Sequence, residues 1–277
     1  MKKTLISALL LVIAVAASVV FQPGKHPAPP QNNTSEQSNS VVPGSDVYTP
    51  QLNDDSEDYG KSFEPPAPSE RTIEGVLLAD GVTMGDAPAG YFEEALFVGD
   101  SRMNGLQLYG DIKEASWYAA TSMSVYNYND KQVDVQGVGV TSLDNLLSQK
   151  KYKRIYVNMG INEIGYDMEY LKNTYTEFYN KLRTMQPDAK IIIMSNLHVT
   201  KAYSDTSTNG ITNPRLNELN EHLKAMQDGE HIFYLDTNHL FDDANGALAA
   251  ECTGDGVHVF AQQYLDISAY LRSHAIY

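Results

Sequence analysis

The chain has 277 residues and a formal net charge of −15, with 42% hydrophobic and 20% charged residues. These fractions are near those of soluble globular proteins and predict a folded core. The negative charge would repel phosphate backbones, which argues against a nucleic-acid partner. The single cysteine, Cys252, excludes an internal disulfide framework and a multi-cysteine zinc site, and a lone thiol is usually a small buried hydrophobe.

The N-terminus has the pattern of an export signal. Lys2 and Lys3 precede an uncharged, mostly apolar run at residues 4–21, and the sequence turns polar at Gln22. The run is also close to the ~18 residues that can span a membrane. Residues 1–21 are therefore interpreted as either a cleaved signal peptide or an uncleaved signal anchor. We expect the protein outside the cytoplasm, secreted or tethered to the membrane through residues 4–21.

Residues 22–85 have a different composition from the rest of the chain. They are rich in Pro, Ser, Asn and acidic residues, as in HPAPPQNNTSEQSNS and NDDSED. Such segments bury too little apolar surface to offset the entropy lost on ordering. We predict a disordered acidic stalk over residues 22–85, followed by one folded domain over residues 86–277.

From about Ala87 onward, short apolar runs alternate with longer amphipathic stretches. The expected strands are Ala95–Val98, Ser116–Thr121, Arg154–Met159, Lys190–Ser195 and Ile232–Asp236. The expected helices are Leu143–Gln149, Met168–Met185, Pro214–Met226 and Gln262–Ser273, with Asn213 suited to cap the third. This alternation predicts an α/β fold with a parallel sheet between helices, in which ligands bind at the carboxyl ends of the strands.

Three polar clusters fall at that edge of the sheet. Ser101 follows the first strand directly, Asn162 follows the third in NMGINEIG, and Asp255 and His258 precede the last helix in GDGVHVF. A serine hydroxyl is a weak nucleophile, so it needs a base such as His258 and an acid such as Asp255 to orient that base. The amide of Asn162 and the backbone N–H of Ser101 could stabilise an oxyanion. The clusters therefore predict ester hydrolysis.

These motifs resemble the SGNH or GDSL hydrolases, which include esterases, lipases, thioesterases and carbohydrate deacetylases. FVGDS is similar to the first block of the family, GINE to the third and DGVH to the last, and the resemblance spans residues 96–270. It implies a three-layer α/β/α sandwich with a mostly parallel five-stranded sheet, flavodoxin-like, and no metal or organic cofactor. It also implies a nucleophile at Ser101, an oxyanion amide at Asn162, and the catalytic pair Asp255 and His258.

The sequence departs from the family pattern at three places. Arg102 stands where the signature has leucine, and Glu163 replaces the usual aspartate of the third block, where we expect it to order the loop. The second block, YAATSMSVYNY, lacks the glycine whose backbone N–H usually joins the oxyanion hole. Ser122 or Ser124 could supply that N–H if the backbone adopts the required turn.

Other interpretations of the same residues stay open. In one alternative, Asp100 and Ser101 cap the following helix and have no catalytic role. A second Asp-x-x-His, Asp236 and His239, follows the fifth strand, where a role in ordering the loop is the better interpretation. His198, Asp236 and His239 are suitable residue types for binding a metal ion, but they lack the tight spacing of a ligand set. We therefore expect no metal site.

The long polar loop at residues 198–213 has the length of a lid or binding element. Tyr203 in this loop, with Tyr118, Tyr126 and Tyr128 after the second strand, could form a platform for a sugar ring, or could simply pack. The sequence predicts an exported serine esterase that removes short acyl groups, such as acetyl, from a carbohydrate or cell-envelope polymer. The alternatives are an O-acyltransferase that uses the same acyl-serine, and a non-catalytic glycan-binding or scaffold domain.

Overall fold

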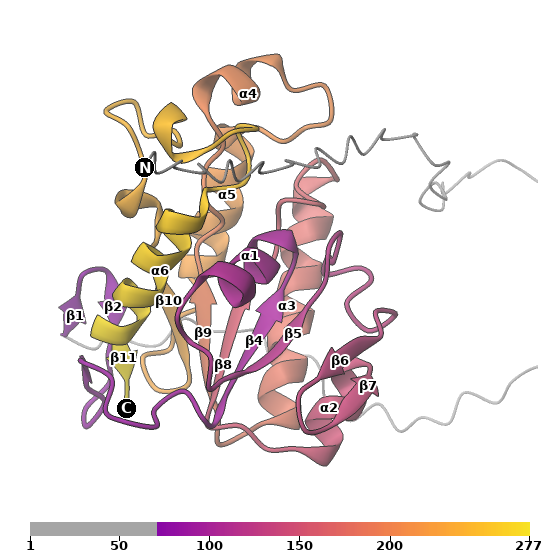
Figure 1. The fold of residues 1–277 in the computed structure, drawn as a ribbon, viewed down its shortest axis with the longest axis vertical. Coiled ribbons are helices and arrows are strands. Elements are labelled where there is room, and N and C mark those ends of the chain that lie inside the picture. Colours follow the sequence, from indigo (N-terminus) through magenta and orange to yellow (C-terminus); the bar gives the residue numbers. More distant parts are fainter. Residues whose placement is uncertain (1–70) are drawn as a thin grey trace, which may run out of the picture. The chain divides into compact units, whose positions relative to one another are not determined.

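Five buried segments form the central sheet of the protein, whose computed structural model describes residues 71–277 (Figure 1). The strands are β4 (Ala95–Gly99), β5 (Ser116–Ala119), β8 (Arg154–Asn158), β9 (Lys190–Met194) and β10 (Ile232–Leu235). They pair in parallel in the order β10-β9-β8-β4-β5. The sheet confirms the predicted α/β class, and this strand order is the flavodoxin-like one.

Side chains alternate between the two faces of the sheet and build a separate core on each side. In β4, Leu96 and Val98 belong to one core, whereas Ala95 and Phe97 belong to the other, and all four are fully buried. A parallel sheet that is covered on both faces needs apolar residues at consecutive positions. This requirement explains why the strands are continuous apolar runs in the sequence.

Helices cover both faces of the sheet and complete the three layers (Figure 1). The first core packs against α2 (Leu143–Gln149), α3 (Met168–Met185) and α5 (Asn213–Lys224). The second packs against α1 (Ser101–Tyr109) and α6 (Ala261–Ser273), which lie side by side in front of the sheet in Figure 1. The predicted bounds of α2 and α3 are confirmed.

Several short elements surround this framework and were not expected from the sequence. They are β1 (Thr72–Ile73), β2 (Val76–Leu77), β3 (Met84–Gly85), β6 (Val133–Val135), β7 (Gly139–Thr141), α4 (Lys201–Thr206), η1 (Asn238–Leu240), η2 (Ala250–Cys252) and β11 (Ala275–Ile276). Antiparallel pairing joins β1 to β2 and β6 to β7. It also joins β3 to β11, which comes last in the sequence.

The first short strands correct the predicted boundary of the stalk. Val76 and Leu78 are almost completely buried in the second core, and Val82 packs there too. Residues 71–85 therefore belong to the folded domain, because the burial of three apolar side chains anchors this segment. The predicted signal segment and the rest of the stalk, residues 1–70, lie outside the described residues. Within residues 71–277, no helix combines the length and apolarity needed to cross a membrane.

The topology brings polar loops together at one point of the sheet. β4 has β8 on one side and β5 on the other, so the strand order reverses there. Gly99 pairs with Asn158 and Ala119, so the three strands end level with one another. In open α/β sheets the carboxyl ends of strands at such a reversal point form the ligand-binding edge.

Candidate active site

Ser101 begins helix α1 immediately beyond the end of β4. Asp100 is the N-cap residue of this helix, and its carboxylate accepts a hydrogen bond of 2.9 Å from the backbone N–H of Arg102. Gly99 makes the turn possible, since a Cβ at this position would lie 2.2 Å from the carbonyl oxygen of Asn158. Asp100 thus has the capping role that was the alternative interpretation, and it holds Ser101 at the edge of the sheet.

The structure brings Ser101, His258 and Asp255 together from distant parts of the chain. The Ser101 Oγ lies 2.9 Å from Nε2 of His258, although the two residues are 157 positions apart. The other ring nitrogen of His258, Nδ1, lies 2.7 Å from Oδ2 of Asp255. A carboxylate at Nδ1 selects the tautomer with its proton there, which leaves Nε2 as an acceptor for the serine hydroxyl. This geometry can move a proton from serine to imidazole.

The 253–258 loop, which carries His258 and Asp255, is held by hydrogen bonds between near neighbours. Oδ1 of Asp255 accepts the backbone N–H groups of Val257 at 2.8 Å and of His258 at 2.7 Å. The Thr253 hydroxyl donates to the carbonyl oxygen of His258 at 2.6 Å. Partial burial raises the pKa of Asp255, but the hydrogen bonds from His258 and Val257 outweigh it and bring the pKa below its usual value. The acid therefore stays ionised.

Arg102 ties this loop to the rest of the domain, a role that was not predicted. Its side chain is 3% exposed, and its guanidinium donates to the carbonyl oxygens of Leu197 at 2.8 Å and Val257 at 3.0 Å. Burial lowers the pKa of Arg102, and the neighbouring Asp100 opposes that effect. A cationic residue beside the buried Met103 and Leu106 was the signal for this role, since buried arginines are almost always bonded.

Glu163 connects the loop after β8 to the 120–128 loop after β5. Its carboxylate accepts a hydrogen bond from the backbone N–H of Val125 at 2.9 Å and one from the hydroxyl of Tyr175 at 2.6 Å. Burial raises the pKa of Glu163 to about 7, and burial raises that of Asp100 to about 6. Glu163 thus orders the loop, as its position after the third strand led us to expect.

The 120–128 loop adopts a tight turn although it contains no glycine. Ser122 adopts a φ of 59°, in the left-handed region that favours glycine. Its backbone N–H makes no hydrogen bond within the described part of the chain. The N–H of Ser124, in contrast, donates to Oδ1 of Asn127 at 2.9 Å, and Nδ2 of Asn162 donates to the carbonyl oxygen of Met123 at 2.8 Å. Ser122 therefore presents a free donor, and Ser124 does not.

Comparison with known protein families decides the class of this site. The model of the GDSL-like lipase/acylhydrolase family matches residues 97–264, more than half of the chain. The chain belongs to this family. It is accordingly an acylhydrolase, an enzyme that hydrolyses carboxylic esters. The match covers the end of β4 and Ser101 as well as the loop that carries Asp255 and His258.

Solved structures that are similar to this chain share little sequence with it. One described as a "putative platelet activating factor from Streptococcus pneumonia" is 17% identical with a TM-score of 0.52, covering 65% of this chain and 82% of that one. A GDSL-like lipase from Bacteroides thetaiotaomicron is 14% identical, with a TM-score of 0.48 and coverages of 66% and 89%. An acetylxylan esterase from Geobacillus stearothermophilus is 14% identical, with a TM-score of 0.44 and coverages of 64% and 92%. No curated protein matches the chain.

The tyrosines predicted to bind substrate occupy different environments in the acylhydrolase. Tyr118 is fully buried, and its hydroxyl lies 2.8 Å from the carbonyl oxygen of Tyr128, so the prediction that Tyr118 binds substrate is wrong. It lies within β5, where alternation turns its side chain into the first core. Tyr126 stacks on Tyr170 at 5.7 Å, and Tyr203 lies against the 253–258 loop. Tyr126 and Tyr203 stay predictions as substrate contacts.

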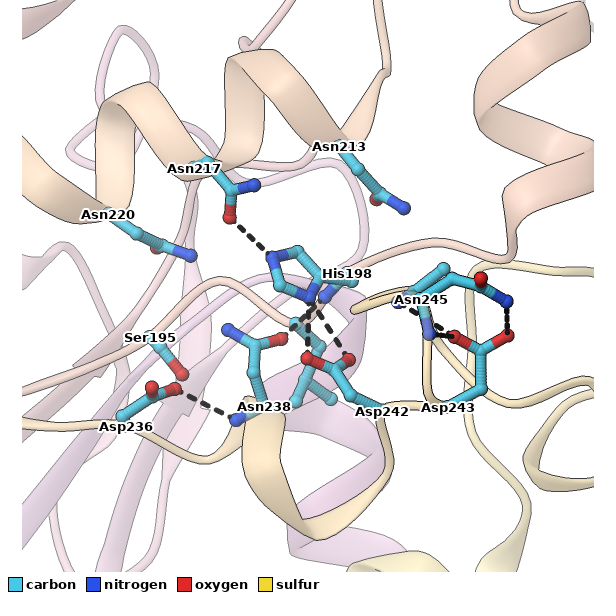
Figure 2. A network of polar contacts seen from close by, with 12 residues as sticks. Ser195, His198, Asn213, Asn217, Asn220, Asp236, Asn238, Asp242, Asp243 and Asn245 are labelled. Carbon is cyan, nitrogen blue, oxygen red and sulfur yellow. Dashed lines mark hydrogen bonds and ion pairs between the residues drawn. The ribbon is translucent and has the colours of Figure 1, made fainter.

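The three residues considered as metal ligands, His198, Asp236 and His239, make other contacts in the acylhydrolase. Both ring nitrogens of His198 have partners, as Figure 2 shows. Asp236 accepts the backbone N–H of Asn238, and the ring of His239 packs edge-on against Tyr270. Asp236 and His239 thus order their loop, as expected, and within residues 71–277 no group of ligating side chains is arranged to hold a metal ion. Cys252 is a free, partly buried thiol.

Proposed function

We propose that this acylhydrolase is an exported serine esterase that removes short acyl groups, such as acetyl, from a carbohydrate or cell-envelope polymer. The observation that carries the proposal is the continuous hydrogen-bonded series from the Ser101 hydroxyl through His258 to Asp255. A hydroxyl, an imidazole and a carboxylate in this order are the parts of a serine nucleophile with its base and orienting acid.

In the proposed mechanism, Ser101 Oγ attacks the ester carbonyl carbon while its proton passes to Nε2 of His258. Asp255 stabilises the imidazolium that forms. The tetrahedral intermediate collapses as His258 returns the proton to the leaving alcohol, and an acyl-serine is left. Water then attacks the acyl-serine, giving one proton to His258, and the acid is released as Ser101 regains its proton. The sum is one ester and one water converted to one alcohol and one acid.

Three donors are proposed to stabilise the oxyanion. They are the backbone N–H of Ser101, the backbone N–H of Ser122 and the side-chain amide of Asn162. Loss of one such donor typically lowers the rate by ~100 to 1000-fold. Asn162 has a second N–H beyond the one it gives to Met123, so it can hold the loop and still donate to the substrate.

The exposure of the catalytic pair supports a large substrate. The side chains of His258 and Asp255 are 43% and 55% exposed, so an ester on the surface of a polymer can reach them. Export is proposed from the signal-like pattern of residues 1–21 and from the polar stalk that follows it.

Hydrolysis by the full chain tests the proposed function. We expect turnover of p-nitrophenyl acetate, and a loss of at least ~10⁴-fold in kcat with Ser101→Ala. Ser122→Ala is the matched control, because it removes a nearby serine hydroxyl but keeps the backbone N–H. Full activity in Ser101→Ala would overturn the proposal.

Product analysis tests the acceptor and the substrate. Acetate released from acetylated polysaccharides indicates hydrolysis, whereas acetyl groups recovered on an added sugar would indicate transfer. Release should depend on Ser101.

A further inference from the structure

A polar cleft lies beside the loop that carries His258, outside the residues assigned to ester hydrolysis. Its volume is about 270 Å³. One wall is α4, the second is the first turns of α5, and the third is the turn at residues 245–247. The side chains that give the cleft its character are Lys201, Ser204, Asp205, Asn213, Asn217 and Asn245.

The wall formed by α5 is a row of asparagines on one face of the helix. Asn213, Asn217 and Asn220 are spaced four and three residues apart, so their side chains project from the same side (Figure 2). Asn213 uses both halves of its amide on the backbone of Val199, and Asn220 does the same on Asn196. Asn217 differs, since only its carbonyl oxygen is bonded. Its amino group has no partner in the described part of the chain.

A buried histidine fixes the orientation of the Asn217 amide. His198, 8% exposed, lies with Nε2 at 2.6 Å from Oδ1 of Asn217 and with Nδ1 at 2.9 Å from a carboxylate oxygen of Asp242 (Figure 2). Burial lowers the pKa of His198, but the bonds to Asp242 and Asn217 outweigh it and raise the pKa above its usual value. When both ring nitrogens of His198 carry a proton, Asn217 presents its oxygen to His198 and its NH₂ group away from it.

The chemistry of the lining favours a neutral, hydroxylated ligand. Asn217 offers donors, and the Ser204 hydroxyl, which accepts from the backbone N–H of Asn213 at 3.0 Å, keeps its own O–H donor. Lys201 and Asp205 form an ion pair of 2.5 Å across one turn of α4, so the wall carries no net charge there. The cleft has neither an aromatic nor a large aliphatic side chain in its lining. The polar side chains of this lining suit the hydroxyl groups of a sugar better than an acyl chain.

One segment separates this cleft from the 253–258 loop. The backbone N–H of Thr200 donates to the carbonyl oxygen of Gly256 at 2.9 Å, and Lys201, the next residue, already lines the cleft. Tyr203, the residue before Ser204 in α4, lies against Gly256. A polymer that reaches Ser101 past Tyr203 can therefore extend across α4 into the cleft.

We propose that the cleft is a second subsite that binds a saccharide unit of the same polymer whose ester group reaches Ser101. The proposal rests on the proposed esterase function and adds the class of polymer, a glycan, together with Asn217 as a specificity-determining residue. Such a subsite would raise kcat/KM for an acetylated oligosaccharide and leave a small aryl ester unaffected, because the aryl ester does not span α4.

Kinetics of two variants of the full chain test the subsite. Asn217→Asp keeps the oxygen that His198 needs but replaces the free amino group by an acceptor. Asp205→Trp fills the cleft from an exposed position, and Ala202→Trp is its control on a side of α4 outside the cleft lining. We expect Asn217→Asp and Asp205→Trp to lower kcat/KM for acetylated xylotetraose or chitotetraose about 10-fold, as for loss of about one good hydrogen bond. Both variants should hydrolyse p-nitrophenyl acetate at the wild-type rate. Ala202→Trp should match the wild type on the small ester and on the oligosaccharides.

A binding measurement separates the subsite from the esterase. In Ser101→Ala, we expect the side-chain amide NMR signal of Asn217 to shift on titration with unacetylated xylotetraose or chitotetraose. Equal losses on both kinds of ester, or no loss on the oligosaccharide, would overturn the subsite. Turnover of p-nitrophenyl acetate without any shift at Asn217 would also overturn it and leave the esterase standing. A shift at Asn217 in a protein without Ser101-dependent turnover would support the subsite and overturn the esterase.

Discussion

The 253–258 loop and the 120–128 loop both border Ser101, but they are stabilised in opposite ways. The 253–258 loop is held mostly by itself, since the Asp255 carboxylate and the Thr253 hydroxyl bond residues at most five positions away. The 120–128 loop depends on side chains from far along the chain. Asn162 is 39 positions from Met123, and Glu163 is 38 positions from Val125.

The difference shows two ways of building a rigid loop at the edge of a sheet. Asp255 needs only its own backbone neighbours, so a short motif can specify the loop wherever it occurs. The loop after β5 has a serine at φ 59°, a conformation that costs free energy without glycine, and the hydrogen bonds from Asn162 and to Glu163, in the loop after β8, offset that cost. We therefore expect substitutions in the first loop to act mainly on activity, and substitutions around the second to act mainly on stability.

The largest expected effect is the loss of the local support of His258. Asp255→Asn would put an amide where a carboxylate selects the tautomer of His258, and we expect kcat for p-nitrophenyl acetate to fall by ~10⁴-fold. The thermal midpoint should change little. Asp236→Asn, in the other Asp-x-x-His, is the matched control and should keep full activity. Comparable losses in both variants would contradict the assignment of Asp255.

The contact that Arg102 makes with the 253–258 loop provides the next test. Arg102→Met would leave the buried carbonyl oxygens of Leu197 and Val257 without their donor, and we expect a loss of about 3 kcal/mol in the free energy of unfolding. Urea denaturation measures this loss. Lys153→Met removes a cation from an exposed ion pair with Glu94, so it should cost about 0–1 kcal/mol. A wild-type midpoint for Arg102→Met would show that the loop needs no such tie.

The buried carboxyl that holds the 120–128 loop predicts a pH dependence of stability. Because the pKa of Glu163 is raised from 4.5 to about 7, the folded state keeps its proton while the unfolded state loses it. Stability should therefore be greatest below pH ~4.5, fall as the pH rises toward ~7, and then level off, with about 3 kcal/mol from Glu163. Glu163→Gln, which mimics the protonated acid, should remove this part of the slope in urea denaturation at several pH values.

Two controls separate the effect of Glu163 on the pH profile of stability from the effects of other titrating groups. Asp100, whose pKa is raised to about 6, contributes a slope of the same sign, and this slope should persist in Glu163→Gln. Glu218→Gln, at an exposed ion pair, should leave the profile unchanged. An unchanged profile in Glu163→Gln would contradict the expected titration of Glu163.

The smallest expected effect concerns the backbone of Ser122. Glycine adopts a φ of 59° without strain, so Ser122→Gly should raise the free energy of unfolding by up to ~1 kcal/mol and keep kcat within about twofold. Ser122→Val, whose branched side chain resists this conformation, should lower stability by about 1–2 kcal/mol. A loss of activity in Ser122→Gly would indicate that the hydroxyl, and not the backbone N–H, is needed.

The sequence predicted more of the fold than of the loops. All five strands of the sheet, and α2 and α3 with their bounds, follow from apolar runs and amphipathic periods that depend on near neighbours. The helix α4 was missed because Lys201–Thr206 has no buried residue, and without an apolar face no period marks it. Asn213 was expected to cap α5, but Thr212 is the N-cap residue, because the Asn213 amide is bonded to Val199 instead.

The sequence by itself determined the α/β class, the order of the polar clusters along the chain, and the hypothesis that Ser101, Asp255 and His258 act together. These features depend on residue type, spacing and local periodicity. Tertiary structure alone decided that Tyr118 is buried, that Ser122 and not Ser124 has a free N–H, and that Arg102 holds the loop of His258. Each of these depends on which distant groups fill the hydrogen-bonding capacity of a residue, and only the packing of the sheet and its helices brings those groups into contact.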